Sequence, residues 1–333
     1  MAPNHSKYHY IPEKPHIFIF TSHDTGKYFH TYGAPVLSPN IEKFADQVVK
    51  FTKHFATAPQ CSPSRSSILT GKHPHVNGEL GLAHHGWNLS EKNLTMPRYF
   101  AQHDYSTYLI GLQHTHMKAR KLGYTNISPR RDFPYYASTV KRRFKKLINK
   151  IEIGKELGPV FCSIGVQETH RPFLAPKRTN TTPTYKAEVP PYLPNTSGTR
   201  REIGKLEGSV QTLDNHIGKM INMILNSSFR ERSIIVFTVD HGIAFPRAKC
   251  TLYDPGIETA LMIYWAKKIK NQEPIDSLIS NVDLFPTLAD LVGLPLSDEI
   301  KKELNGRSFA AKLLGTPYQE RSHIFAEMTF HEQ

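Results

Sequence analysis

The 333-residue sequence has few cysteines, no long apolar run and fewer acidic than basic residues. Its three cysteines are an odd number without Cys-x-x-Cys spacing, which excludes a disulfide framework and a zinc ribbon. No apolar run approaches the roughly 18–20 residues that a membrane-spanning helix requires, so we expect no transmembrane segment and no membrane partner. The first residues lack the charged-then-apolar layout of a secretory signal. On these grounds we expect a cytoplasmic protein.

Basic residues outnumber acidic ones, with 42 Lys and Arg against 29 Asp and Glu, for a formal net charge of +13. This balance favours an anionic partner, but it does not choose among nucleic acid, an anionic sugar and a phosphate ester. The strongest basic run, residues 141–146, is interrupted by Phe144, and apolar residues recur on both sides of it at helical spacing. We interpret this run as the solvated face of a helix and expect no nucleic-acid partner.

Short apolar strands alternate with amphipathic helices along the chain. The strands are predicted at residues 16–21, 107–110, 160–164 and 233–239, and the helices at 38–48, 140–151, 201–226 and 282–291. A long surface excursion is expected at 172–198, where Pro, Thr and Asn are frequent. The alternation predicts an α/β fold with a central, mostly parallel β-sheet sandwiched between helices.

Two of the predicted strands are followed by a His and Asp pair. His23 and Asp24 come after the first strand, and Asp240 and His241 come after the strand at 233–239. Ligands of such folds gather beyond the carboxyl ends of the strands, so the chemistry is expected at these two pairs.

The most specific stretch is residues 58–71, Ala-Pro-Gln-Cys-Ser-Pro-Ser-Arg-Ser-Ser-Ile-Leu-Thr-Gly. Pro63 is expected to open a short helix and Gly71 to end it, which places Cys61 just ahead of a helix N-terminus. The unpaired N–H groups there favour an anion or an activated nucleophile. Arg65 lies one turn further on and can return its guanidinium to the same place. Cys61 is therefore the candidate nucleophile.

Cys-x-Pro-Ser-Arg followed by Leu-Thr-Gly is the signature of the type I sulfatases of the alkaline phosphatase superfamily, and the sequence resembles that family along nearly its whole length. It is most similar to the heparan N-sulfatase (sulfamidase) branch at residues 111–114, 168–173, 237–246, 249, 252–256, 283–287 and 306–308. The resemblance implies a hydrolase of sulfuric ester or sulfamate bonds that acts on a small anionic substrate, a sulfated or N-sulfated sugar.

The resemblance also implies roles for individual residues. Cys61 would be oxidised to formylglycine by a formylglycine-generating enzyme, and its hydrate would be the nucleophile. Arg65 would orient it, and His114 would hydrogen-bond it. His170 would contact the sulfate or protonate the leaving group, and Lys249 would bind the sulfate.

A glycine-bounded loop, residues 81–87, follows the expected nucleophile helix. We expect its His84 and His85 to shape the substrate pocket and to bind substrate. The alternative is a packed surface loop with Trp87 as its anchor.

The resemblance implies one divalent metal ion, held by His23, Asp24, Asp240 and His241 together with the group at position 61. Most members of the family carry Asp-Asp and Asp-Asn pairs at these places, which give calcium an all-oxygen site. Two imidazoles make the site softer, so Mn²⁺, Zn²⁺ or Fe²⁺ is plausible beside Ca²⁺. Either histidine could instead be turned away from the metal.

A second departure concerns a lysine that precedes the first catalytic histidine in the family, where this sequence has Leu112. The positive charge of that lysine would have to come from another residue, and the candidates are Lys118, Arg120, Arg247 and His116. Asp-His pairs also occur in phosphonate and phosphodiester hydrolases of the same superfamily, so such a hydrolase is the alternative function.

Length is a third departure, because sulfatases of this kind are longer. We assign residues 1–320 to the catalytic domain and residues 321–333, with an expected strand at 323–329, to the start of a C-terminal subdomain that is truncated or absent. An inactive, truncated polyanion-binding homologue is a further alternative, and a homo-oligomer is left open.

Overall fold

A computed structural model describes residues 14–156, 158–173, 187–269, 273–294 and 296–330. Much of the surface excursion expected at 172–198 lies outside the described residues, and its last part begins a helix. Within the described residues no helix is both long and apolar enough to cross a membrane.

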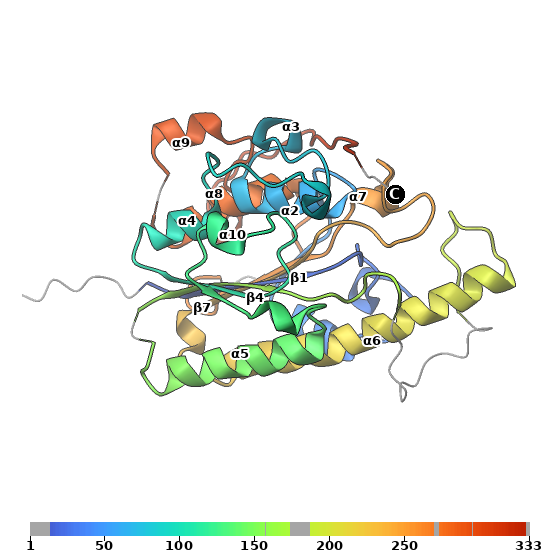
Figure 1. The fold of residues 1–333 in the computed structure, drawn as a ribbon, viewed down its shortest axis with the longest axis horizontal. Helices are drawn as coiled ribbons and strands as arrows, with labels where there is room; N and C mark the ends of the chain where they lie inside the picture. Colours follow the sequence, from blue (N-terminus) through green and yellow to red (C-terminus); the bar gives the residue numbers. More distant parts are fainter. Residues whose placement is uncertain (1–13, 157, 174–186, 270–272, 295, 331–333) are drawn as a thin grey trace, which may run out of the picture.

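A seven-stranded sheet lies at the centre, in the order β2-β8-β7-β1-β6-β4-β5 (Figure 1). Only β8 runs antiparallel to its two neighbours, which confirms the mostly parallel sheet. The strands are β1 His16–Ser22, β2 Val49–Phe51, β4 Ser106–Gly111, β5 Asn126–Ile127, β6 Val160–Gly165, β7 Ser233–Val239 and β8 Leu261–Tyr264. A separate two-stranded sheet pairs β3 His54–Phe55 with β9 Ile279–Ser280.

Helices cover both faces of this sheet (Figure 1). Side chains of β1 alternate between the two layers, with Phe18 and Phe20 packed in one core cluster and Ile17 and Ile19 in the other. The first cluster contains residues of α1 Pro39–Ala45, α5 Ala137–Glu152 and α6 Ser197–Leu225. The second contains residues of α2 Cys61–Thr70, α4 Met96–Ala101, α8 Leu284–Leu291 and α10 Ala310–Leu313. The remaining α-helices of the described residues are α3 Pro74–Asn77, α7 Asp254–Ile257 and α9 Asp298–Glu303.

The predicted elements form, with shifted ends. α6 begins at Ser197 rather than 201, because the Thr196 side chain accepts a hydrogen bond from the Thr199 N–H and caps the helix there. α2 begins at Cys61 rather than Pro63. A proline is tolerated in this first turn because its missing N–H would have no partner within the helix.

The strand expected at 323–329 does not form. The segment makes separate backbone hydrogen bonds, from Glu327 N–H to the Thr57 carbonyl at 2.8 Å and from Phe330 N–H to the Leu80 carbonyl at 2.8 Å. These two acceptors lie in different segments, so no continuous ladder is available to it.

Candidate active site and metal centre

The register of the central strands brings both His and Asp pairs together. β1 and β7 are parallel neighbours with Ser22 opposite Val239, so the residues that follow each strand emerge side by side. The Asp24 N–H donates to Asp240 Oδ1 at 2.9 Å, as does the His241 N–H, which ties the two strand ends together.

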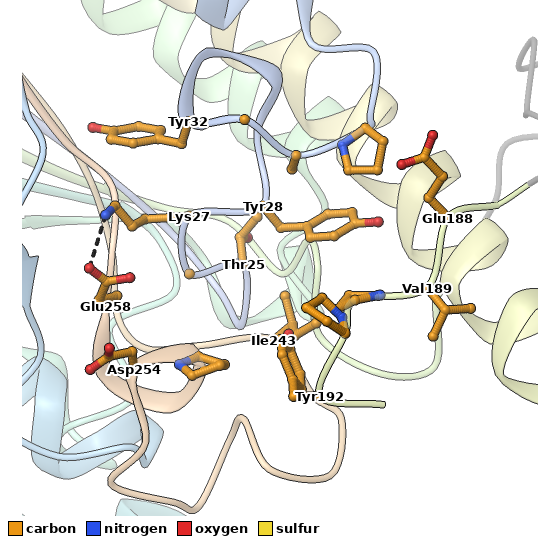
Figure 2. A pocket seen from close by; sticks show the side chains of 17 residues that line it. Thr25, Lys27, Tyr28, Tyr32, Glu188, Val189, Tyr192, Ile243, Asp254 and Glu258 are labelled. Carbon is orange, nitrogen blue, oxygen red and sulfur yellow. Dashed lines mark hydrogen bonds and ion pairs between the residues drawn. The ribbon is translucent and has the colours of Figure 1, made fainter. Parts of the chain in front are cut away.

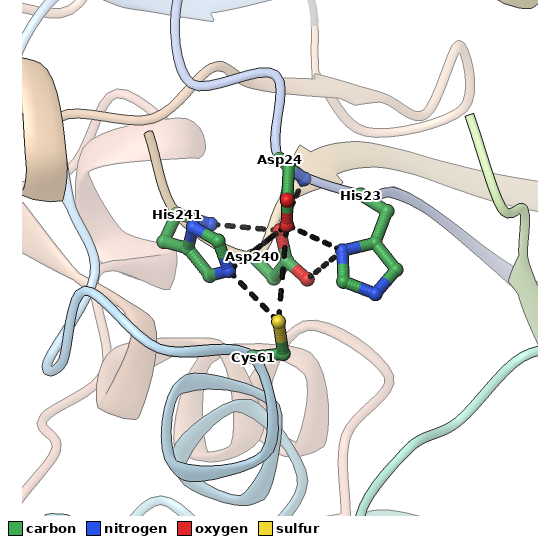
Figure 3. Close-up of side chains that lie close together, drawn as sticks. All are labelled: His23, Asp24, Cys61, Asp240 and His241. Carbon is green, nitrogen blue, oxygen red and sulfur yellow. Dashed lines mark hydrogen bonds and ion pairs between the residues drawn. The ribbon is translucent and has the colours of Figure 1, made fainter. Parts of the chain in front are cut away.

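Five side chains form a buried cluster at this edge of the sheet (Figure 3). One donor atom from each lies within 4.8 Å of every other, and they belong to His23, Asp24, Cys61, Asp240 and His241. His23 Nδ1 is 2.6 Å from Asp24 Oδ1 and 3.1 Å from Asp240 Oδ2. His241 Nε2 is 3.1 Å from Asp24 Oδ1 and 3.2 Å from Cys61 Sγ. Neither histidine is turned away.

The helix that carries Cys61 is polar and wholly buried, an arrangement that its own hydroxyls make possible. The hydroxyls of Ser66 and Ser67 donate to the Pro63 carbonyl at 2.8 and 3.1 Å, and Thr70 donates to the Ser66 carbonyl at 2.8 Å. Because these hydroxyl groups have hydrogen-bond partners within the helix, α2 can be buried and can hold Cys61, its first residue, at the cluster.

Two cations flank the carboxylates. Lys249 Nζ is 2.7 Å from Asp24 Oδ2, and Arg65 Nε is 2.9 Å from Asp240 Oδ2. Burial opposes ionisation of both carboxyls, but Lys249 and His23 outweigh it and hold the pKa of Asp24 well below its usual range, while His241, His23 and Arg65 lower that of Asp240. The site therefore holds two buried carboxylates in the ionised form.

Charged neighbours also shift the pKa values of the remaining cluster members, downward for the thiol and upward for the imidazoles. Burial opposes ionisation of the Cys61 thiol, yet Lys249 and His23 lower its pKa. Burial also opposes a charge on His23, but Asp240, Cys61 and Asp24 raise the pKa of that ring to about 9. Two carboxylates, two imidazoles and a sulfur around one point fit a single divalent cation, and the imidazoles suit one softer than calcium.

His170 and His114 stand beside the cluster, beyond the ends of β6 and β4. The His23 ring is 4.6 Å from that of His170 and 5.8 Å from that of His114, measured between centroids. His170 Nδ1 donates to the Arg171 carbonyl at 2.6 Å, and within the described residues Nε2 is the ring nitrogen without a hydrogen bond. Within the described residues, His114 Nδ1 is buried and has no hydrogen-bond partner.

The 81–87 loop lies beside His114 and is packed at Trp87, while substrate binding by His84 and His85 stays a prediction. His84 Nδ1 lies 2.9 Å from His114 Nε2, and the two rings stack. His85 packs edge-on against His84 at 4.2 Å, so it is one ring further from the cluster. Trp87 stacks on Phe330 and anchors the loop. His84 thus reaches the cluster through His114.

In the part of the chain that the structure describes, none of the four candidates for the missing lysine charge binds a cluster residue. Leu112 lies at the end of β4, and Arg120 donates to the Thr125 carbonyl at 3.4 Å, away from the site. His116 accepts a hydrogen bond from the Lys118 N–H at 2.8 Å. Among the described residues, neither Lys118 nor Arg247 has a hydrogen bond or ion pair with a cluster member. Lys249 is therefore the lysine of this site.

Two supporting residues escaped the sequence analysis. Ser64 donates its hydroxyl to the Asp240 carbonyl and accepts from Asn281 Nδ2 at 2.8 Å. Ser64 belongs to the Cys-x-Pro-Ser-Arg motif, so its place there was a usable signal. Asn281 follows β9, far along the chain from Ser64, and no motif in the sequence pointed to it.

A hollow of about 420 Å³ lies next to the cluster (Figure 2). Its wall includes Thr25 and Ile243, each close in sequence to a cluster residue, and three tyrosines, Tyr28, Tyr32 and Tyr192. None of the five cluster residues lines it.

Comparison with known proteins decides the family. The sulfatase family profile matches residues 15–294. The chain belongs to the sulfatase family. This places it among the type I sulfatases of the alkaline phosphatase superfamily, as its motif and fold predicted.

Relatives of this sulfatase-family chain include an ulvan-active sulfatase of Formosa agariphila, 25% identical over 95% of this chain and 57% of the relative. The human N-sulphoglucosamine sulphohydrolase is 23% identical over 89% of this chain and 65% of the relative. The chain thus spans about three fifths of the length of these relatives.

Solved structures show the same fold in other sulfatases and related hydrolases. A phosphonate monoester hydrolase from Silicibacter pomeroyi superposes with a TM-score of 0.76 at 18% identity, over 92% of this chain and 78% of the other. A protein bound to its substrate D-glucosamine-2-N,6-O-disulfate gives a TM-score of 0.74 at 18% identity, over 93% of this chain and 82% of the other.

Proposed function

We propose that this chain hydrolyses a sulfuric ester or sulfamate bond of a sulfated or N-sulfated sugar, with formylglycine made from Cys61 as the nucleophile. The observation that carries the proposal is the position of Cys61. It begins a buried helix, and its Sγ lies 3.2 Å from His241 Nε2 and 3.8 Å from Asp24 Oδ1. Membership of the sulfatase family and the relatives named above, one of them a sulphohydrolase of N-sulphoglucosamine, support it.

The divalent cation would be held by His23, Asp24, Asp240 and His241, with the group at position 61 completing the donor set. When bound, such an ion polarises an oxygen of the transferring sulfuryl group. The two imidazoles favour Mn²⁺ or Zn²⁺ over Ca²⁺ in this chain.

A plain thiol has no second hydroxyl group, which the hydrated aldehyde of formylglycine supplies. One hydroxyl of the hydrated aldehyde attacks sulfur, and the S–O or S–N bond to the sugar breaks with its electron pair on the leaving group. The second hydroxyl then loses its proton, the carbonyl forms again, and sulfate leaves with the C–O bond pair. The intermediate therefore clears without attack of water on sulfur.

The surrounding side chains have separate tasks in this proposal. Lys249, which is 12% exposed and bound to Asp24, presents its ammonium to the sulfate oxygens. Arg65 keeps Asp240 oriented beside position 61. The free Nε2 of His170 faces the leaving group, and His114 binds the nucleophile through the nitrogen that His84 does not engage.

Mass spectrometry of the peptide that contains Cys61 tests the proposal directly. In a host with a formylglycine-generating enzyme, we expect position 61 to lose one sulfur and two hydrogens and to gain one oxygen. Hydrolysis of an aryl sulfate should then appear and should vanish in Cys61→Ala. An unmodified thiol together with no hydrolysis would refute the proposal and would leave the inactive polyanion-binding homologue in its place.

A phosphodiester or phosphonate monoester hydrolase is the second candidate. Sulfate monoesters and phosphodiesters each carry one negative charge, and a site with Lys249 as its lysine suits either. Parallel assays with an aryl sulfate, a sulfamate and an aryl phosphodiester separate the two, because the ratio of kcat/KM values reports which transition state the site prefers. A higher kcat/KM for the phosphodiester would make this candidate the function.

A further inference from the structure

Four cations on α5 have no part in the chemistry proposed above. Arg142, Lys145 and Lys146 are exposed and Lys141 is half-buried, while Phe144 between them is fully buried on the side of the helix that packs in the core. We call these four residues the basic strip. Its members are two pairs at i and i+4, so each cation has a like charge one turn away.

Nothing on the helix compensates for these charges. The sequence of α5 has no acidic residue before Glu152, and Glu152 accepts hydrogen bonds from Ser228. The neighbouring Arg143 is paired with Asp132 at 2.6 Å, but no member of the basic strip forms an ion pair within the described part of the chain. Like charges at this spacing destabilise a helix, and an anionic ligand would remove that repulsion.

Further positive charge lies around the N-terminal end of the strip. Asp132 has a lowered pKa because Arg143 hydrogen-bonds it and because Arg142 and Arg131 lie nearby. On α6, burial and the charges of Lys141 and Lys219 together lower the pKa of His216 to about 4. The cationic surface therefore reaches from the turn before α5 across to α6.

The start of α5 is tied to the active site. The Ala137 N–H donates to Glu168 Oε2 at 2.8 Å, and the Glu168 carbonyl accepts from the His23 N–H at 3.0 Å. At 1.5 Å per residue, Lys145 lies about 12 Å along the helix from Ala137. The N-terminal end of the strip is therefore the end nearer to the active site.

We propose that the basic strip binds a sulfated polysaccharide of which one sulfate group enters the active site, so that the substrate is a polymer. This rests on the proposed function. A sulfated polysaccharide carries anions at repeated intervals, which match cations that lack partners of their own. Nucleic acid fits less well, because single strands are held largely by stacking on exposed aromatic rings. Along α5 the aromatic ring, Phe144, is buried, and the exposed ring of Phe133 lies before the helix, outside the strip.

The test compares two double variants of the full chain, each of which removes two lysine charges. K145Q/K146Q acts on the strip. K301Q/K302Q acts on α9, where Asp298, Glu299 and Glu303 already balance the charge, and it serves as the matched control. Both pairs are exposed, so neither change disturbs the core.

Heparin is the polymer probe, and its dissociation constant is measured by calorimetry at several salt concentrations. We expect K145Q/K146Q to weaken heparin binding about threefold, and the variant with all four strip residues replaced by Gln about tenfold. The control should bind as the wild type does. Hydrolysis of an aryl sulfate, which is too small to reach the strip, should be equal in all variants.

Three results would overturn the proposal: equal heparin binding in all variants, an equal loss in the α9 control, or tighter binding of single-stranded RNA than of heparin through the same four residues. Absence of aryl sulfate hydrolysis in a wild-type chain with formylglycine would refute the proposed function instead. The heparin measurements do not need turnover, so the two failures remain distinct.

Discussion

The glycine that follows His241 offers a sharp test of how the cluster is positioned. A Cβ added at Gly242 would lie 1.8 Å from the Pro255 carbonyl oxygen and 2.8 Å from Gly256 Cα. Both neighbours are backbone atoms, so no side-chain rotation relieves the overlap. The Gly242 N–H also donates to the Gly256 carbonyl at 2.9 Å, which fixes the two segments against each other.

The size of the expected loss in kcat/KM follows from the distance between the added Cβ and the Pro255 carbonyl oxygen. Non-bonded heavy atoms rest at roughly 3.5 Å, so Gly242→Ala requires a relative backbone shift of about 1.7 Å. His241 is the adjacent residue, and its Nε2 lies 3.2 Å from Cys61 Sγ. Because a misplacement of about 1 Å can cost about 100-fold in rate, we expect kcat/KM to fall at least about 100-fold.

The assay is kcat/KM for an aryl sulfate, with divalent metal content and thermal unfolding measured on the same preparations. Gly198→Ala is the control, since its Cβ would meet only the Thr196 hydroxyl oxygen at 3.7 Å within the start of α6. We expect that control to keep full activity. A Gly242→Ala protein that retained the wild-type kcat/KM and metal content would refute the reasoning.

Three further changes probe individual interactions. Burial lowers the pKa of His54 to about 3, so the ring stays neutral in the folded state while the unfolded chain takes up a proton below its ordinary pKa of 6.5. Stability is thus lost as the pH falls through this window, and in urea titrations His54→Gln should show a pH slope shallower by up to about 1.4 kcal/mol per pH unit. Ser64→Ala removes the donor to the Asp240 carbonyl, and chemical denaturation should show a loss of about 1–3 kcal/mol. Phe144→Ala empties a fully buried position in contact with Phe18 and should cost about 3–5 kcal/mol by the same measurement, whereas an unchanged midpoint would refute the packing.

Local patterns in the sequence predicted much of the fold. β1 was predictable because Ile17, Phe18, Ile19 and Phe20 are apolar on both faces, as a central strand between two helical layers requires. α5 was predictable from its buried stripe of apolar residues at helical spacing. The prediction of a strand at 323–329 was wrong because a local segment alone does not provide a partner strand with free backbone groups.

The meeting of the two His and Asp pairs was also predictable, because each pair follows a strand of a parallel sheet. The contact between His84 and His114 was not, since it joins two loops whose paths depend on packing rather than on local pattern. The start of α2 was set too late because Pro63 was taken as the first helical residue, although the first turn accepts proline at later positions.

The burial of α2 limits when an enzyme can modify position 61 relative to folding. Every residue of the helix is buried, and Cys61 is only 1% exposed. Gln60, just before it, is held by Thr329 through its amide oxygen and nitrogen. An enzyme that modifies position 61 must therefore reach this segment while it is still extended. Under the proposed function, conversion of Cys61 would therefore compete in time with folding, and a mutation that speeds the docking of α2 would lower the fraction of converted protein.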